Sequence, residues 1–399
     1  MKPAAMSPDA GRDPLRIAVA VQSLDTLGGK ERDALAIAGG LAARGHRVTL
    51  LTRPPASAAL AALTKAPAAL AIEPVEALAW SNHARARRFA QAAAQIGRDG
   101  RFDVVLSFEK SGQADAYYAA DVCLAARTGP LKRWLPRYRA YLQLEADCMA
   151  SGGPDLLFLC RKQADDYLRC YGPAGAGTSD AAARSMVLPP MIHAEPTGHF
   201  YGRRDEVRRE FGVPSGAPMA VAVAVYGRQK GLDRSIDALR RIGELHLVAV
   251  GLKDAGPMAA LARRHGLAAR VHLDGRRGDV ADVLGAADLM LHPARVENTG
   301  LVIVESLLAG VPVIASGVCG FGEYIERFGA GTVLAEPFDA DAYAAAIGAA
   351  LAPARLETLR RHARDSAAPL SAEGGLERIL DRIEAVLRRR APDPPRAPG

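Results

Sequence analysis

The chain has 399 residues, with 51 Lys and Arg against 44 Asp and Glu, so its formal net charge is +7. This length predicts two to three domains, and a composition of 49% hydrophobic and 24% charged residues indicates a folded protein and excludes wholesale disorder. The five cysteines are scattered without a C-x-x-C pair, which argues against a disulfide scaffold or a zinc site. We expect neither a secretory signal nor a membrane span, because no apolar stretch of suitable length is uninterrupted.

The first half alternates apolar runs with helical patterns. A glycine turn at Gly28 and Gly29 leads into a helical pattern over Glu31–Arg44, whereas the Ala- and Pro-rich residues 54–76 predict a loop with a weak helix. Runs suited to buried parallel strands stand at Arg16–Val21, Val48–Leu51, Asp103–Phe108 and Leu156–Cys160. This order is typical of β-α-β units in a doubly wound sheet.

A second series follows a linker that begins near Leu188 and runs to Tyr201. Strands are predicted at Met219–Val225, His246–Val250, Val271–Leu273, Leu289–His292, Val313–Ile314 and Thr332–Leu334. Helices are predicted at Ser235–Ile242, Met258–His265, Asp279–Ala286, Asp339–Leu351, Leu356–Arg364 and Gly374–Arg389. The Pro-rich tail from Ala391 reads as disordered.

The two halves echo each other, which predicts an α/β protein of two Rossmann-like, doubly wound domains. We place the domains at residues 14–190 and 191–390, and the last helix, about 374–389, is a candidate to pack back on the first domain. Ligands of such sheets bind beyond the carboxyl ends of the strands, so a cleft between the domains is the expected site.

Two glutamates eight residues apart, Glu297 and Glu305, form the most informative motif. Glu297 follows a predicted strand, and Thr299 is expected to cap a helix that carries Glu305. One carboxylate at the strand end and one on the helix can hold two hydroxyl-bearing parts of a ligand, while the helix N-terminus favours a diphosphate. The alternative is a capped helix with ordinary surface glutamates, which the flanking sequence ADLMLHPA and GLVIVESLLAGVPVI disfavours.

Tyr226–Gly231, with the sequence YGRQKG, directly follows a predicted strand. A cation there, Lys230 or Arg228, can stabilise the charge that develops on a departing diphosphate. The alternative is a solvated charged turn.

The first half contains two weaker candidate sites. Gly28 and Gly29 permit close approach of the backbone to a ligand, with a plain turn as the alternative, and Asp33 follows them. Asp121 comes after the segment FEKSGQADAYYAA and places a carboxylate beyond a strand, with a helix-capping role as the alternative. His46 is expected to sit in a structural loop without catalytic work.

Residues 126–141 interleave cations with apolar and aromatic side chains. That mixture suits the headgroup region of an anionic membrane surface, where each cation adds about 1 kcal/mol. One alternative is a helix in which the aliphatic parts of the Lys and Arg side chains cover the core. The other is a groove that binds nucleic acid.

The segment from His292 to Glu323 resembles that of the retaining glycosyltransferases of family 4, which have the GT-B fold. The resemblance assigns Glu297 to the donor sugar, Glu305 to the nucleotide ribose and Lys230 to the donor phosphates. Val225 stands where the family usually has an arginine, so Arg228 is the candidate substitute. The same resemblance implies donor contacts at Gly28, Gly29, Asn298, Thr299, Gly300 and Leu301, and places Asp33 near the sugar or acceptor.

The segments FEKSGQADAYYAADV and RYRAYLQLE, the latter ending at Glu145, are similar to those of lipopolysaccharide core glucosyltransferases. This similarity implies hexose transfer, with glucose favoured, from a UDP-sugar to an inner-core heptose, with Asp121 as the active-site carboxylate. It also implies no metal or other cofactor and a peripheral position on the cytoplasmic face of the inner membrane. The alternatives are another nucleotide-sugar or glycolipid acceptor, an epimerase of the UDP-N-acetylglucosamine type and a basic nucleic-acid-binding protein.

Overall fold

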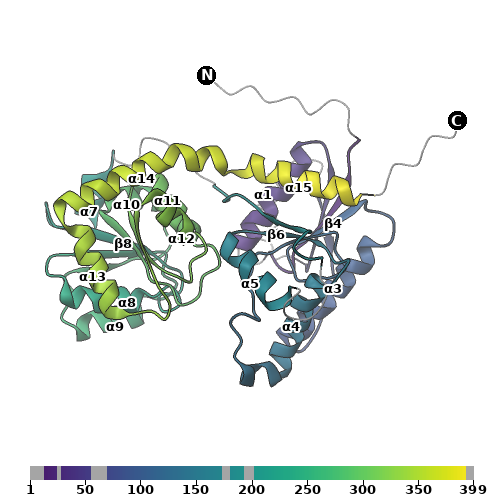
Figure 1. The fold of residues 1–399 in the computed structure, drawn as a ribbon, viewed down its shortest axis with the longest axis horizontal. Helices are drawn as coiled ribbons and strands as arrows, with labels where there is room; N and C mark the ends of the chain where they lie inside the picture. The colour runs from purple at the N-terminus through teal and green to yellow at the C-terminus, as the bar shows by residue number, and fades with distance from the viewer. Residues whose placement is uncertain (1–12, 25–27, 55–69, 173–179, 193–201, 392–399) are drawn as a thin grey trace. The chain divides into compact units, whose positions relative to one another are not determined.

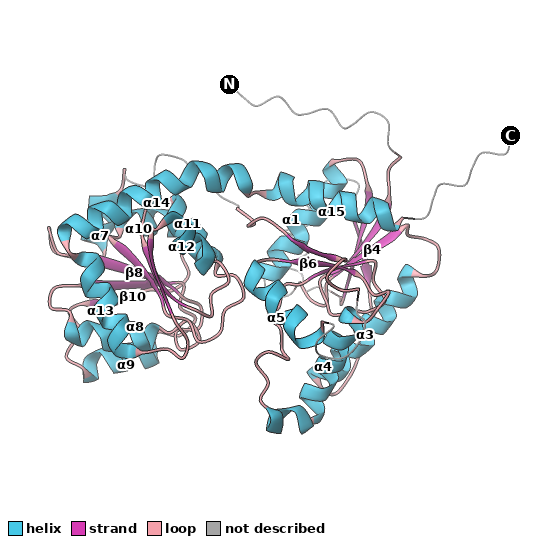
Figure 2. Ribbon diagram, in the orientation of Figure 1, coloured by secondary structure: helices cyan, strands magenta, loops and turns pink. Residues whose placement is uncertain are grey.

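The computed structural model describes residues 13–24, 28–54, 70–172, 180–192 and 202–391. The chain forms two compact units, the first of residues 1–191 with 376–399 and the second of residues 192–375. Each unit is a parallel sheet flanked by helices (Figures 1 and 2). Because the last segment returns to the first unit, the second unit is an insertion in its sequence.

The first unit is built on a seven-stranded parallel sheet. Its strands are β1 (Arg16–Ala20), β2 (Arg47–Thr52), β3 (Leu70–Pro74), β4 (Val104–Ser107), β5 (Ala116–Tyr118), β6 (Asp155–Phe158) and β7 (Ser185–Val187), in the order β3-β2-β1-β4-β5-β6-β7. Its helices are α1 (Gly29–Ala43), α3 (Asn82–Gly97), α4 (Pro136–Met149), α5 (Arg161–Tyr171) and α15 (Leu376–Arg390), with a 3₁₀ turn η1 at Pro130–Trp134.

The core of the first unit forms around β1, whose register pairs Ile17 with Val48 on one side and Val104 on the other. A strand with neighbours on both sides and helices on both faces is buried on both faces, which explains why Ile17–Ala20 are all apolar and only the first residue, Arg16, is exposed. The helix α15 packs on α1, where a Cβ on Gly40 would lie 2.4 Å from a methyl of Leu380. The missing side chain therefore lets the two helices approach closely.

The polar edge of this helix pair is closed by ion pairs. Arg44 at the end of α1 contacts Glu377, Asp381 and Glu384 of α15 at 2.7, 2.7 and 3.2 Å. His46 is buried in the loop before β2, where its Nδ1 accepts a hydrogen bond from the Leu15 amide at 3.1 Å. The structure thus gives His46 the structural position expected of it.

The second unit is built on a six-stranded parallel sheet. Its strands are β8 (Met219–Val223), β9 (His246–Val250), β10 (Val271–Leu273), β11 (Leu289–His292), β12 (Val313–Ser316) and β13 (Gly331–Leu334), in the order β10-β9-β8-β11-β12-β13. Its helices are α7 (Arg204–Glu210), α8 (Leu232–Ala238), α9 (Gly256–Arg264), α10 (Val280–Ala286), α11 (Leu301–Leu308), α12 (Gly322–Phe328), α13 (Ala340–Leu351) and α14 (Pro353–Glu373), with η2 at Leu239–Arg241.

The expected loop over residues 54–76 is wrong in its last part, because β3 occupies Leu70–Pro74 and pairs with β2. The strand was missed because it is a half-exposed edge strand of five residues. Residues 55–69 of that expectation, the tail from residue 392 and most of the linker lie outside the described residues. The three-residue strands β5 and β7 were also missed, since they are too short to show a periodicity.

No helix in the described part of the chain is both long enough and apolar enough to cross a membrane.

Candidate active site

The site of the second unit lies beyond the carboxyl ends of β8 and β11, which are neighbours in the sheet. Lys230 follows β8, Glu297 follows β11, and the Nζ of Lys230 lies 2.5 Å from Oε2 of Glu297. His292, the last residue of β11, places its Nε2 2.9 Å from the same oxygen. The structure therefore joins two predicted loops through one carboxylate.

The Glu297 carboxylate is only 11% exposed, and burial by itself would raise its pKa. The hydrogen bond to His292 and the charge of Lys230 outweigh burial and lower the pKa to about 2. Its second oxygen accepts a hydrogen bond from the Asn298 amide at 3.1 Å. Glu297 is thus an anion at neutral pH with its position fixed from both oxygens.

The two loops are locked to each other by a close backbone approach and by the side chain of Arg295. Gly231 has φ +72°, and a Cβ there would lie 1.9 Å from the carbonyl oxygen of Pro293. Arg295 contacts both carboxylate oxygens of Asp233 at 2.7 and 2.8 Å and also donates to the Arg228 carbonyl. The distance between the Lys230 and Glu297 loops is therefore set by a glycine and a bidentate ion pair.

The helix α11 begins after Gly300, which has φ +79° and occupies the N-cap position. The expected Thr299 cap is wrong, because no side chain caps this helix. The left-handed turn at Gly300 leaves Thr299 one residue outside the helix, where its carbonyl accepts a hydrogen bond from the Phe321 amide at 2.7 Å. The Asn298 carbonyl accepts from the Gly320 amide at 2.9 Å, so the Gly320 turn is fixed against this loop.

Glu305 lies on α11 as expected and is half-buried. Leu301 begins the same helix, so the first-turn amides and both motif glutamates belong to one strand–loop–helix segment. Helix amides that have no partner within the helix favour a negative group at this end.

Arg228 lies beyond β8 with an exposed side chain. Its guanidinium makes no hydrogen bond or ion pair to any residue that the structure describes. Lys230, in contrast, is neutralised by Glu297. Arg228 is therefore the cation of this loop whose charge remains available to an anionic ligand.

In the first unit, a second charged group lies beyond the carboxyl ends of β1, β4 and β5. Lys30 Nζ lies 2.7 Å from Oε1 of Glu109, which also accepts from the Gln22 amide at 3.1 Å. The hydroxyl of the buried Tyr118 donates to Oδ2 of Asp33 at 3.0 Å. Asp33 on α1 and the end of β5 are therefore tied together.

The predicted glycines stand where α1 begins, since Gly28 is its N-cap and Gly29 its first residue. Neither has a positive φ. A Cβ on Gly28 would meet the Glu31 carboxylate at 2.7 Å, whereas Gly29 faces open space. The start of the helix at these glycines is confirmed, and neither adopts a backbone conformation that only glycine can adopt.

Asp121 lies three residues beyond β5, and its side chain is exposed. It is not the N-cap of any helix in the described chain, so the capping alternative is wrong. Gln163 of α5 donates to its backbone carbonyl at 2.8 Å. The loop is held through its backbone while the Asp121 side chain faces solvent.

Residues 126–141 contain η1 and the start of α4. Leu131 is 86% exposed, Trp134 79% and Leu135 51%, and no residue of η1 is buried. The interpretation that this segment covers the core is therefore wrong for η1. A cavity of about 410 Å³ opens beside it, with Arg133 and Arg139 among the lining residues.

Comparisons with known proteins give this arrangement a family. Residues 203–367 match the family model described as glycosyl transferases group 1. The chain is 32% identical over 323 residues to the lipopolysaccharide glucosyltransferase WaaG of Escherichia coli K12, covering 78% of this chain and 83% of that protein. The chain belongs to the WaaG glycosyltransferase family.

Solved structures agree with the WaaG assignment. A crystal structure of WaaG is 30% identical with a TM-score of 0.78, covering 92% of this chain and 99% of that one. An Anabaena HepE structure in complex with UDP-glucose, 18% identical with a TM-score of 0.69, shares the fold. A D-inositol 3-phosphate glycosyltransferase of Xylanimonas cellulosilytica is 30% identical over 204 residues, which are 48% of this chain and 47% of that protein.

The expected fold is confirmed: this WaaG-family chain has the GT-B fold of two Rossmann-like domains. It is a glycosyltransferase. The alternatives of an epimerase and of a nucleic-acid-binding protein lose their support with this membership.

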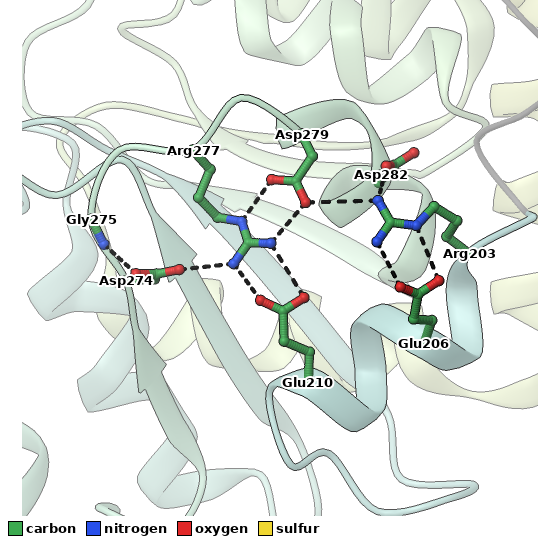
Figure 3. A network of polar contacts seen from close by, with 8 residues as sticks. All are labelled: Arg203, Glu206, Glu210, Asp274, Gly275, Arg277, Asp279 and Asp282. Atoms are coloured by element: carbon green, nitrogen blue, oxygen red, sulfur yellow. Dashed lines mark hydrogen bonds and ion pairs between the residues drawn. The ribbon is translucent and has the colours of Figure 1, made fainter.

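Sequence reasoning missed a charged network that fixes the loop after β10 (Figure 3). Arg277 contacts Glu210, Asp274 and Asp279, and Figure 3 shows Arg203 bridging to the same cluster. The Gly251 amide donates to the Gly275 carbonyl at 2.7 Å, which joins this loop to the one after β9. These residues stand in a sequence rich in charge, where nothing marks three acids as partners of one arginine.

His292 was missed as well. It ends an apolar strand, and a histidine in that place is more often a satisfied core residue than part of a site. Its spacing of five residues from Glu297 was the available signal, because a strand end and the following loop can bring such residues together.

Proposed function

We propose that this WaaG-family protein transfers a hexose, glucose first among the candidates, from a UDP-sugar to a heptose of the lipopolysaccharide inner core, with retention of configuration. The observation that carries the proposal is the Lys230–Glu297–His292 group beside the start of α11. The activity named for the Escherichia coli relative supports it.

The donor is assigned to the second unit. Glu305 would accept hydrogen bonds from the ribose hydroxyls, and Glu297, an anion with a pKa of about 2, would accept them from the sugar. The diphosphate would face Arg228, Lys230 and the amides around Asn298, Thr299, Gly300 and Leu301. Lys230 has three N–H donors, of which Glu297 takes one, so it can bind both carboxylate and phosphate.

The transfer step places negative charge on the diphosphate as the bond between the sugar and its phosphate oxygen breaks. Groups already fixed around that charge stabilise it without reorganising, which is the largest contribution that such sites make. Here the fixed groups are Lys230, which Glu297 holds, and the first-turn amides of α11, while the exposed Arg228 adds a further positive charge. We therefore expect no metal ion or other cofactor in the reaction.

The acceptor is assigned to the first unit. The exposed carboxylate of Asp121 would accept a hydrogen bond from the reacting hydroxyl, and Asp33 would lie near the sugar or acceptor. The Gly28–Gly29 turn at the same edge is assigned to the donor, as the family resemblance implies. Asp33 is oriented by Tyr118, whose ring stacks on Phe108 with centroids 4.5 Å apart. The position of the Asp33 carboxylate is thus fixed by buried aromatic side chains of the core.

The test is Glu305→Ala in the full-length protein, assayed for UDP release from UDP-glucose in the presence of a lipopolysaccharide acceptor that ends in heptose. Turnover should be lost while the melting temperature without ligand stays close to that of the wild type. Glu357→Gln is the matched control, because Glu357 forms an exposed ion pair with Arg364 on α14. Full activity of Glu305→Ala would contradict the proposal.

A thermal melt with UDP-, GDP- and ADP-sugars identifies the donor, because a selective ligand raises the melting temperature by mass action. We expect a shift with UDP-sugars that disappears in Glu305→Ala. A larger shift with a GDP- or ADP-sugar would exclude UDP as the donor nucleotide.

We also propose that residues 126–141 dock on the anionic cytoplasmic face of the inner membrane. The support is an exposed Leu131–Trp134–Leu135 surface with cations between, beside a cavity that Arg133 and Arg139 line. Vesicles with anionic lipid should sediment the wild type but not Leu131→Ser/Trp134→Ser. Trp80→Ser, which removes a fully exposed tryptophan elsewhere in the first unit, is the control. Equal binding of both variants would contradict docking through this segment.

A further inference from the structure

Glu145 of α4 is a carboxylate that the proposed chemistry leaves unused, and it is fully buried. Its Oε1 lies 2.6 Å from the Lys110 ammonium and accepts a hydrogen bond from the Leu124 amide at 2.9 Å. Its Oε2 accepts from the Ala125 amide at 2.9 Å and from the Tyr171 hydroxyl at 3.0 Å. The Cys123 thiol also donates to Oε2 at 3.8 Å, so five donors from three other segments converge on one side chain.

Burying this carboxylate is costly unless every oxygen is satisfied. Burial raises the pKa of Glu145, but the charge of Lys110 and the backbone hydrogen bonds lower it overall, so Glu145 remains an anion. A buried ion pair adds little net stability compared with apolar residues of the same volume, and its better use is to fix one arrangement of the chain.

The segment held by Glu145 is the loop after β5 that carries Asp121. Gln163, buried at the start of α5, holds the beginning of this loop through hydrogen bonds to the carbonyls of Ala119 at 2.6 Å and Asp121 at 2.8 Å. The side-chain oxygen of Gln163, Oε1, accepts a hydrogen bond from the Leu159 amide at 2.8 Å, which fixes the orientation of this side chain. Glu145 holds the other end of the loop, so the exposed Asp121 side chain stands between two buried anchors.

Lys110 connects the buried carboxylate to the exposed one. Burial lowers the pKa of Lys110, but the charges of Glu145 and then Asp121 raise it above its ordinary value. Asp121 is therefore within electrostatic reach of the ammonium that Glu145 holds. The side chain of Lys110 is 12% exposed, which leaves it a small face toward solvent.

We propose that Glu145 and Gln163 are positioning residues for glycosyl transfer: they hold the Asp121 loop from both ends without touching a substrate. The inference rests on the proposed function, in which Asp121 acts on the acceptor. A displacement of about 1 Å at a reacting group can lower a rate about 100-fold. Neither Glu145 nor Gln163 belongs to the second unit, to which the donor contacts of Glu297, Glu305 and Lys230 are assigned. The affinity for UDP-glucose should therefore stay unchanged in variants of Glu145 and Gln163, and it serves as an internal reference.

The test is Glu145→Gln, which keeps the size of the side chain but removes its charge and one acceptor oxygen. In the full-length protein, kcat for UDP release with the lipopolysaccharide acceptor should fall about 10- to 100-fold. The KM for UDP-glucose and the rise in melting temperature that it causes should stay within about twofold of the wild type. Asp155→Asn is the matched control, because it breaks another ion pair of this unit that holds a buried carboxylate, with Arg390 at 2.8 Å, at the amino end of β6.

Asp155→Asn should keep kcat within about twofold even where it lowers the melting temperature. Gln163→Leu should reproduce the kcat loss of Glu145→Gln, and it gives an independent reading where Glu145→Gln does not fold. In an Asp121→Asn background, Glu145→Gln should lower kcat no further, because both changes then act through one group.

An unchanged kcat in folded Glu145→Gln, an equal loss in Asp155→Asn, or multiplied losses in the Asp121→Asn background would overturn the inference. A wild-type protein that releases no UDP with any heptose-ended acceptor would instead overturn the proposed function.

Discussion

In the second unit the loops around Glu297 are held by backbone geometry, whereas in the first unit the loop of Asp121 is held by buried side chains. Gly231 and Gly300 adopt positive φ values, and the Asn298 and Thr299 carbonyls accept hydrogen bonds from the Gly320 turn. In the first unit, Glu145 and Gln163 reach across from α4 and α5 to the loop backbone.

The difference separates two kinds of sensitivity. A loop held by close backbone contacts fails when any side chain is added, because carbonyl oxygens cannot yield as the end of a flexible side chain can. A loop held by buried carboxylate and amide groups fails when one donor or acceptor is removed, because its partners stay buried and unsatisfied. Adding a side chain to a loop of the first kind should therefore destabilise the fold. Removing a donor or acceptor from a loop of the second kind should first displace the loop.

The largest effect is expected for Gly231→Ala, because its Cβ would lie 1.9 Å from the Pro293 carbonyl at a positive φ. The second unit should lose about 4 kcal/mol of stability, measured by urea unfolding. Gly266→Ala is the control, since Gly266 also has a positive φ but no atom near the added carbon, so it should lose only about 1 to 2 kcal/mol. Equal losses would show that backbone strain, and not the close contact, decides.

The next effect is the acid sensitivity contributed by Glu297, whose pKa is about 2 against an ordinary value of 4.5. A lowered pKa adds stability that is fully present above pH 4.5 and is lost as the pH falls toward 2. The difference is worth about 3 kcal/mol. Glu297→Gln should flatten the pH dependence of urea unfolding in this window, and an unchanged slope would show that the carboxylate is not held by Lys230 and His292.

A smaller effect is expected for Tyr118→Phe in the first unit, which removes the hydrogen bond to Asp33 but keeps the ring that stacks on Phe108. The loss of stability should be about 1 kcal/mol, with a reduced kcat and an unchanged shift by the donor. A reduced donor shift would place Asp33 on the donor side and would blur the division between the two units.

The smallest change in stability is expected for Arg228→Met, because its guanidinium has no partner among the described residues. The free energy of unfolding should change by no more than about 0.5 kcal/mol, so the melting temperature without ligand should hardly move. The rise caused by UDP-glucose should shrink, since a cation is lost from the diphosphate. An undiminished rise would leave Lys230 and the helix amides as the phosphate-binding groups.

The parts of the site that could be predicted from the sequence are those formed within one short segment of the chain. The spacing of Glu297 and Glu305 placed one carboxylate in a strand-to-helix loop and the other on α11, and the structure confirms both positions. Lys230 was predicted to follow a strand, but its pairing with Glu297 across 67 residues has no local signature.

The remainder depends on tertiary contacts. Thr299 has the side chain of a helix cap, yet Gly300 takes that position because the chain turns through a left-handed conformation. Glu145 and Gln163 lie within ordinary amphipathic helices, and only the fold brings them to the loop after β5. Short edge strands such as β3 depend on a neighbour more than on their own pattern.

The return of α15 to the first unit sets an order for folding during synthesis. Its Ile379, Leu380 and Ile383 belong to the same buried cluster as β1 and α1, which are made more than 330 residues earlier. All of the second unit leaves the ribosome before that cluster can close. A chain stopped after α14 would therefore carry a finished second unit and a first unit with an open core, and such an intermediate is a natural substrate for chaperones.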